Sequence, residues 1–485
     1  MPTTAPAPAT GPSMVRFARR STRGVLLGFS LARAVTIAAG VVVMIVGLVS
    51  AGGTGFLVSG VVWAPLLASA FVTVQGKPAI EWAPVAGNYA ARKATGQSEF
   101  RARPSKPRPA GTLALPGDAA SLRFYDDPVT GACMIHDPHR QTISAVLGVE
   151  HPAYVLLAPD EQAQRVSAWG RTLASLAQSG TCAAVQVLEA TVPDPGTGVA
   201  GWYEEHGTHD GAWADGEYQA LLEQSTTGSS THRTTITIAL DMKRGAKAIN
   251  HAGRGMKGAA AVLSADMAGL EQGLRTAGLR VGHWLSATEL AAIVRAAYDP
   301  GSNVLPGQSG AQMETAGPVA ISEHWDRFRS DSGWSAVLWV SDWPRVDVPP
   351  HFLHPLVFSP GVRKTISIVA RPLGTSEALK AIRRAKTEAI SDSQQKAKIG
   401  QIEDLSDAQE YHDLLDRERA LISGHADVAF SGFISVTAPT ETLLSAAVSQ
   451  IERAASQAAC ETRVLYGRQT QGFVVAALPL ARGVL

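Results

Sequence analysis

Two long, uncharged and mostly apolar runs near the start of the chain constrain its fold more than any other feature. The first covers residues 34–51 and the second covers residues 53–74. A helix needs about 20 apolar residues to cross the hydrocarbon core of a bilayer, with a working range of about 17–25. Buried helices of water-soluble proteins rarely stay uncharged for this length. The two runs therefore predict a transmembrane hairpin within residues 31–76, with one span in each run.

A cleaved signal peptide is the alternative interpretation of the first run. Val49, Ser50 and Ala51 are small enough to suit a signal peptidase. Such a leader would be unusually long, however, and a second apolar run follows it at once. These two observations favour the hairpin.

Basic residues flank the hairpin on both outer sides and predict its orientation. Arginines precede the first run, no Asp or Glu occurs before Glu81, and the connection at Gly52 carries no charge. Lys and Arg are retained on the cytoplasmic side during insertion. We therefore expect a multi-pass protein of the cell (inner or plasma) membrane with two spans and both termini cytoplasmic. Residues 1–30 are expected to be a basic, disordered N-terminus.

Composition narrows the function of the remaining chain. The 485 residues include 43 Lys and Arg against 42 Asp and Glu, so no global basic field favours the coating of nucleic acid. Three cysteines are too few for a disulfide framework, which indicates a reducing compartment. Hydrophobic residues make up 45% of the chain, enough for a sizeable core.

The soluble part alternates between strand and helix signals and predicts an α/β (α+β) fold with two ferredoxin-like lobes. A basic juxtamembrane linker is expected at 77–118, a first cytosolic lobe at 119–300, a linker at 301–320 and a second lobe at 321–485. The first lobe has the order β-α-β-β-α-β. Its predicted strands are 142–149, 182–192, 233–240 and 279–285, and its predicted helices are 159–178 and 258–278. Residues 194–211 are expected to form a loop, followed by a short helix at 212–223.

The second lobe repeats this alternation. Two charged helical runs, 376–398 and 407–423, suggest a helical hairpin. The predicted strands are 335–340, 365–370, 430–437, 463–466 and 473–478, and a helix is predicted at 440–460.

No motif in the chain predicts nucleotide hydrolysis or a metal centre. The nearest approach to a phosphate loop, Gly361 to Thr365, lacks the upstream glycine and the Gly before Lys364. The glycine-rich turn 253–258 fails the same spacing. Cys133, His136 and His139 place three potential ligands close together, but zinc sites usually show two paired half-sites. We therefore expect no metal and no cofactor.

The sequence also gives little indication of nucleophilic catalysis, since the chain has no G-x-S-x-G elbow. The alternative hypothesis is a membrane-anchored enzyme with its site in the acidic 194–215 loop or around residues 253–258. A pocket gathering His206, Asp210 and Arg254 would support it. The sequence itself favours a protein that is not an enzyme.

Several distinctive segments carry a resemblance to a known family. They are EWAPV at 81–85, LISGHAD at 421–427, SGFISV at 431–436, LYGRQ at 465–469 and LPLARG at 478–483. Together with the hairpin, they resemble a family of actinobacterial integral membrane proteins found with secretion or conjugation genes. The resemblance covers nearly the whole chain from about residue 15.

Two wider resemblances suggest a role. The lobes are similar to the N-terminal part of type IV secretion conjugation ATPases that carry a fused two-span membrane subunit, without the ATPase domain. The layout also resembles EccE of type VII secretion, which has two N-terminal spans and then a cytosolic α/β domain. Both resemblances imply a non-enzymatic structural component of an export apparatus.

The implied partners are the lipid bilayer, other subunits of the apparatus including a separate ATPase, and further copies of the chain, with no direct contact to nucleic acid. A DNA-handling conjugation factor that uses the basic linker is a further alternative. The expected membrane-interface or partner-contact residues are Trp82, Pro84, Arg92, Lys93, Arg101 and Arg103.

Overall fold

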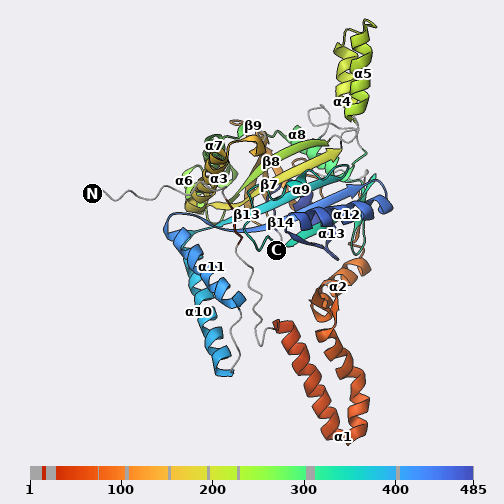
Figure 1. Ribbon diagram of the computed structural model, residues 1–485, viewed down its shortest axis with the longest axis vertical. Coiled ribbons are helices and arrows are strands. Elements are labelled where there is room, and N and C mark those ends of the chain that lie inside the picture. Colours follow the sequence, from red (N-terminus) through yellow and green to blue (C-terminus); the bar gives the residue numbers. More distant parts are fainter. Residues whose placement is uncertain are drawn as a thin grey trace, which may run out of the picture. The chain divides into compact units, whose positions relative to one another are not determined.

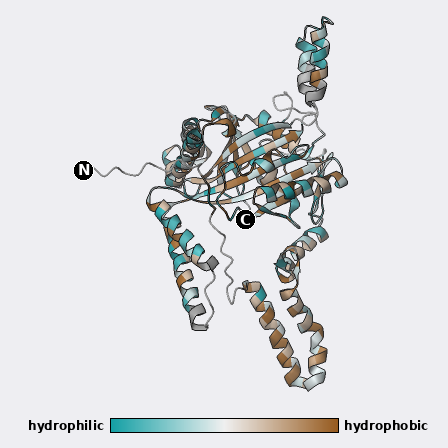
Figure 2. Cartoon of the chain, viewed as in Figure 1, coloured by the Kyte–Doolittle hydropathy of each residue, from teal (hydrophilic) through white to brown (hydrophobic). Residues whose placement is uncertain are grey.

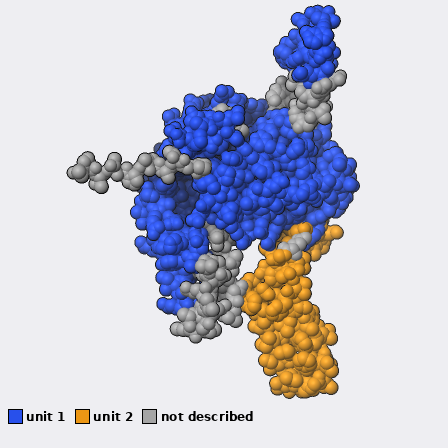
Figure 3. Space-filling view, viewed as in Figure 1, with its two compact units in different colours: residues 1–19, 100–465, 469–485 blue, residues 20–99, 466–468 orange. Residues whose placement is uncertain are grey.

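The computed structural model describes residues 14–17, 29–74, 76–103, 109–150, 154–193, 197–226, 230–301, 312–399 and 405–483. The chain forms two compact units (Figure 3). Residues 20–99 and 466–468 make one of them, and residues 1–19, 100–465 and 469–485 make the other. Of the predicted basic N-terminus 1–30, only residues 14–17, 29 and 30 are described, and residues 302–311 of the predicted linker 301–320 lie outside the described residues.

The membrane-proximal unit is dominated by the apolar helix α1, Leu31–Phe71, which is long and apolar enough to cross a membrane (Figure 2). The helix is interrupted at Ala51 and Gly52, where the backbone leaves helical geometry and Gly52 takes a φ of 61°. Small residues bring the two arms close together. A Cβ placed on Gly47 would lie 2.1 Å from Ser59 Oγ, so only glycine fits there. This apolar helix indicates a membrane protein.

The predicted linker at 77–118 is largely ordered, which corrects the sequence interpretation. It contains helix α2, Ala79–Ala94, after the short strands β1, Thr73–Val74, and β2, Lys77–Pro78. Strand β3, Glu99–Arg101, follows. Leu113 and Leu115 are then fully buried in the core of the larger unit. The prolines and cations of this stretch suggested a linker, whereas its alanines and leucines decide the structure through helix formation and burial.

The first lobe has the predicted ferredoxin-like topology. Its strands are β6, Thr142–Glu150, β7, Cys182–Pro193, β8, Ser230–Asp241, and β9, Arg280–Trp284. They lie antiparallel in the order β7-β8-β6-β9. Helices α3, Pro159–Ser179, and α7, Gly255–Thr276, pack against each other over one face. Leu176 and Leu263 point from these helices into the same core cluster.

The second lobe repeats the same topology with different residues. Its strands are β12, Gly333–Asp342, β13, Arg363–Leu373, β14, Asp427–Ala438, and β15, Glu461–Val464. Their order is β13-β14-β12-β15, equivalent to that of the first lobe. Helix α12, Glu441–Gln457, and the short α9, His354–Val357, cover one face.

The two lobes are halves of one continuous sheet, which the sequence did not predict. Residues 185–191 of β7 pair antiparallel with residues 364–370 of β13, so the second strands of both lobes meet edge to edge. This pairing supplies hydrogen-bond partners for the backbone N–H and C=O groups at the edge of each lobe. The 13-stranded sheet is extended at one end by β4, Arg123–Asp126, and β5, Cys133–Asp137. At the other end it is extended by β3, β10, Ala320–Glu323, and β11, Phe328–Ser330.

Each lobe carries a helical hairpin inserted between its second and third strands. Helices α4, Thr197–His206, and α5, Trp213–Thr226, follow β7. Helices α10, Thr375–Ile399, and α11, Leu405–Ile422, follow β13 as predicted. Because β7 and β13 are antiparallel, the two insertions begin at opposite ends of the central strands (Figure 1). Helix α4 replaces most of the loop predicted at 194–211, where the glycines favoured a loop.

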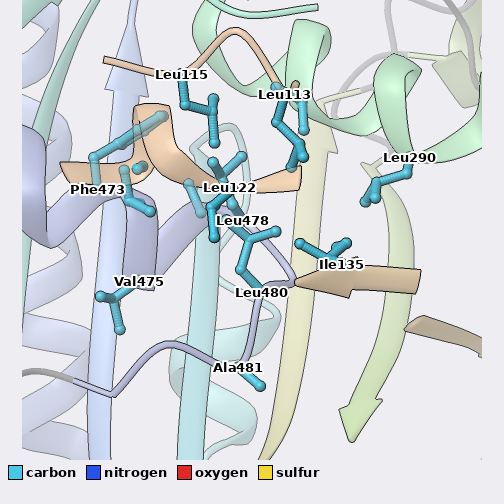
Figure 4. Packing of buried hydrophobic residues seen from close by; sticks show 14 of the residues in the cluster. Leu113, Leu115, Leu122, Ile135, Leu290, Phe473, Val475, Leu478, Leu480 and Ala481 are labelled. Carbon is cyan, nitrogen blue, oxygen red and sulfur yellow. The ribbon is translucent and has the colours of Figure 1, made fainter. Parts of the chain in front are cut away.

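Helix α13, Gln469–Ala477, overturns the strand predicted at 473–478. Residues 472–477 of the helix are buried, and it packs with α8, Ala287–Tyr298, in one core cluster (Figure 4). This cluster lies on the sheet face opposite α3 and α7. Adjacent valines favoured a strand, but a short run that is apolar on every side fits a buried helix equally well.

Candidate membrane-proximal site

Helix α2 is held against the end of α1 and against residues 466–468 by side chains from three parts of the chain. The indole Nε1 of Trp82 donates to the carbonyl oxygen of Val74 at 3.0 Å. The Trp82 and Tyr466 rings pack in a T-shaped arrangement, with 5.4 Å between the ring centroids and 80° between the ring planes. Arg92 Nη2 donates to the carbonyl oxygen of Gly467 at 2.6 Å. These contacts make α2 a bracket between the apolar helix and a turn close to the end of the sequence.

The N-terminal end of α1 is tied to the same bracket. Ser30 Oγ donates to Glu81 Oε1 at 2.7 Å, and the Arg33 guanidinium lies 4.5 Å from the centre of the Phe29 ring. Arg33 also lies 5.5 Å from the centre of the Phe71 ring, at the far end of the second arm. Charged, aromatic and hydroxyl groups therefore gather where both arms of α1 meet α2. This composition is typical of the water–lipid boundary, where Trp, Tyr and Arg are enriched.

The structure brings together some of the six predicted contact residues. Trp82 and Arg92 both reach residues 466–468, whereas Pro84 and Lys93 lie on α2 with exposed side chains. Arg101 and Arg103 are exposed and belong to the larger unit. The contribution of Tyr466 and Gly467 was missed. Both lie in a segment that the sequence marks as distinctive, but no local signal connects it to α2.

The acidic 194–215 segment forms local contacts only. The Tyr203 hydroxyl donates to Asp215, and this bond raises the pKa of Tyr203 to about 12. His206 Nδ1 lies 3.0 Å from the carbonyl oxygen of Trp202, and the Ala212 amide donates to Asp210 Oδ1 at 3.0 Å. Arg254 begins α7. The hydrogen bonds of His206 and Asp210 are thus local, and among the described residues no contact joins these two side chains to Arg254.

The candidate metal ligands of β5 are dispersed by the pleat of the strand. Cys133 is buried, and desolvation raises the pKa of its thiol to about 12, which disfavours the thiolate that a metal requires. Burial also lowers the pKa of His136. Within the part of the chain that the structure describes, no group of three or more His, Cys, Asp or Glu residues could hold a metal ion.

Lys364, from the rejected phosphate-loop motif, is a buried cation in the central pair of strands. It is 1% exposed, and its Nζ donates to the carbonyl oxygen of Ser359 at 2.7 Å. Burial lowers the pKa of Lys364 to about 8, although nearby Glu189 opposes the shift. The residue sits where the two lobes join, opposite Thr191 in the register. These contacts indicate a structural role for Lys364 in the sheet.

A Lys364→Met substitution is expected to change the pH dependence of stability. Between about pH 8 and 10.5 the unfolded chain still holds the Lys364 proton that the folded chain has released. Because the unfolded state binds more protons there, the free energy of unfolding of the wild type rises with pH across that window. Relative to the Met variant, the gain is at most about 3 kcal/mol. Urea unfolding at several pH values measures it, with the exposed Lys380→Met as control. Parallel pH profiles for the wild type and Lys364→Met would contradict the prediction.

The comparisons with known proteins bear on the larger unit. The family model described as "Putative type VII ESX secretion system translocon, EccE" matches residues 228–340. No curated protein matches the chain. The matched segment contains β8, α7, β9, α8 and most of β12, so it spans the passage from the first lobe to the second. The comparisons give no support to the type IV conjugation resemblance. The similarity to EccE, together with the apolar helix α1, points to a membrane component of a type VII secretion translocon.

Proposed function

We propose that this protein is a non-enzymatic, two-span membrane component of a type VII translocon, with a cytosolic double-lobed sheet that docks partner subunits. The match of residues 228–340 to EccE carries the proposal. A separate ATPase is among the proposed partners, because no phosphate-loop motif occurs in this chain. Lipid contacts and association with further copies belong to the same proposal.

The backbone break in α1 supports two spans. Each arm, on either side of Ala51–Gly52, is about 20 residues long. At 1.5 Å per residue, one arm is about 30 Å long, which matches the hydrocarbon thickness of a bilayer. The interruption carries no charged side chain, so it can pass through the membrane during insertion.

A short N-terminal segment independently supports an even number of crossings. Val15 and Val348 exchange both backbone hydrogen bonds, at 2.8 and 3.1 Å. Arg16 pairs with Asp347 at 3.2 Å, and the Phe17 ring stacks on that of Trp343 with 5.4 Å between centroids. These residues precede α1, whereas their partners follow it. This pairing supports a topology with both sides of α1 on one face of the membrane, and the basic flanks favour the cytoplasmic face.

Cysteine chemistry tests this topology. In membranes treated with an oxidant, the Val15→Cys/Val348→Cys pair is expected to form a disulfide, because directly opposed strand residues have suitable geometry. A Thr54→Cys variant should react with a membrane-impermeant maleimide in intact cells. The exposed Val346→Cys should react only after permeabilisation. All three native cysteines are buried, so background labelling is low. Labelling of Val346→Cys in intact cells would contradict the cytoplasmic assignment.

Recovery of partners from membranes tests the function itself. The tagged protein is purified in mild detergent and the co-purifying proteins are identified by mass spectrometry. We expect type VII subunits, including the ATPase. Trp82→Ala should reduce their recovery, because it removes the contacts that hold α2 to Val74 and Tyr466. Lys93→Ala, exposed on the same helix, should not. Purification of the protein alone, under conditions that keep other membrane complexes intact, would reject the proposal.

A further inference from the structure

We propose that the α4–α5 hairpin is a docking surface for a cationic amphipathic helix of a partner protein. The inference goes beyond the proposed function and does not depend on which apparatus the protein serves. It starts from an unusual exposure of large side chains. Trp213 is 81% exposed, Leu221 60% and Trp202 59%. Large apolar side chains grouped on one exposed element are typical of interaction sites.

The exposed side chains share one side of α5. Trp213, Glu217 and Leu221 follow each other at intervals of four residues, which places them along one stripe of the helix. Trp202 lies on α4 and stacks on His206 with 4.9 Å between ring centroids. Trp213 and Leu221 are thus apolar anchors about two helical turns apart with an acid between them, a spacing that suits contact with an amphipathic helix.

Internal contacts fix the shape of this surface before any partner arrives. Tyr203 on α4 packs on Tyr218 of α5, with 4.7 Å between ring centroids, and its hydroxyl bonds to Asp215. His209 Nε2 lies 3.1 Å from the carbonyl oxygen of Glu204, which holds the connecting turn. The tyrosines thus join the two helices, and the tryptophans are more exposed than Tyr218. A pre-organised surface loses less conformational entropy on binding.

Charge determines the kind of partner. The segment 197–226 contains no Lys or Arg. Its acids are Glu204, Glu205, Asp210, Asp215, Glu217 and Glu223. Such a surface repels acidic proteins and attracts cations, and exposed Trp rings also bind Lys and Arg through cation–π contacts. Anionic lipid headgroups would be repelled, so a lipid surface is the less favoured occupant.

The equivalent insertion in the second lobe differs in its exposed side chains and in its charges. Ile390 and Ile422 are exposed there, but no aromatic side chain of its described residues is among the exposed large side chains. In α10 and α11, Ala378, Ile382 and Leu421 form a buried apolar seam. Lys386 pairs with Glu418 across the two helices, and Arg417 pairs with Asp427. The second hairpin thus pairs cations with its acids, whereas the first has no cation from Lys or Arg.

A binding titration with a defined probe tests the proposal. The full-length protein, in nanodiscs of zwitterionic lipid, is titrated into a fluorescent synthetic helix of Lys, Arg, Leu and Ala with its cations on one face. Anisotropy reports binding. The comparison peptides are a scrambled sequence of the same charge and a charge-reversed sequence, which we expect to bind at least about tenfold more weakly.

Surface variants then assign the binding to the hairpin. Trp213→Ala is expected to weaken binding about tenfold or more, because buried aromatic anchors dominate interfaces. Glu204→Gln/Glu205→Gln should weaken it several-fold at low salt and have little effect at high salt. Leu156→Ala, which truncates another highly exposed side chain in the same lobe, is the matched control. Circular dichroism checks that each variant remains folded.

Three outcomes would overturn the inference. These are the absence of binding to the cationic helix, equal affinity of the wild type and Trp213→Ala, and equal affinity for the scrambled peptide. Co-flotation with anionic vesicles that depends on Trp213 would instead assign the hairpin to a lipid surface. None of these results bears on recovery of type VII subunits, so the two proposals fail separately.

Discussion

Gln186→Ala is expected to lower the free energy of unfolding by about 4 kcal/mol. Gln186 is fully buried on β7, on the face covered by α13. Its Nε2 lies 2.8 Å from Ser367 Oγ, 3.1 Å from the Val475 carbonyl oxygen and 3.0 Å from that of Leu478. Its Oε1 accepts the amide of Ala481 at 2.6 Å. The side chain joins both lobes to the C-terminal segment. Its truncation therefore leaves several buried polar groups without this hydrogen-bond partner.

Urea unfolding of the detergent-solubilised full-length protein measures this effect. Gln219→Ala is the matched control, because Gln219 is exposed on α5, where its Nε2 donates to Asp215 Oδ1 at 3.2 Å. The control should change stability by less than about 0.5 kcal/mol. A loss below about 1 kcal/mol for Gln186→Ala would show that the network does not hold the lobes together.

Phe473→Ala should cost about 3–5 kcal/mol, the usual price of removing a buried aromatic ring. Phe473 is 1% exposed on α13, and its ring contacts those of Tyr298 and Phe328 at centroid distances of 5.0 and 4.9 Å. The cavity would open between α8, α13 and β11, where close packing limits collapse.

Phe358→Ala provides the control for Phe473, since the Phe358 side chain is mostly exposed. We expect it to cost less than about 1 kcal/mol under the same urea conditions. Equal losses for the two variants would mean that α13 does not form part of the cooperative core.

Local patterns predicted the topology of each lobe. Alternating β-branched residues such as those of β8, and apolar stripes such as that of α12, depend on a few neighbouring residues and are read without tertiary information. The predictions failed where the same local pattern fits two environments. The valines of α13 suit a strand or a buried helix, and the prolines and cations around α2 suit a linker or a capped helix.

The candidate site was predicted only in part, because local patterns mark some of its residues and not their distant partners. Trp82 and Arg92 stand out because aromatic and basic residues next to an apolar run mark the membrane boundary. Their partners Tyr466 and Gly467 lie more than 370 positions away, and no periodicity connects such distant segments.

The sequence by itself determined the apolar segment with its interruption at Gly52, the α+β class and most of the succession of strands and helices along each lobe, because hydrophobicity and period are local properties. Only the tertiary structure decided that β7 meets β13, that residues 466–468 reach α2 and that α13 fills the core between the lobes. Those contacts form because strand edges need hydrogen-bond partners and apolar faces need burial. The segments that provide them are distant in sequence, so no local pattern identifies them.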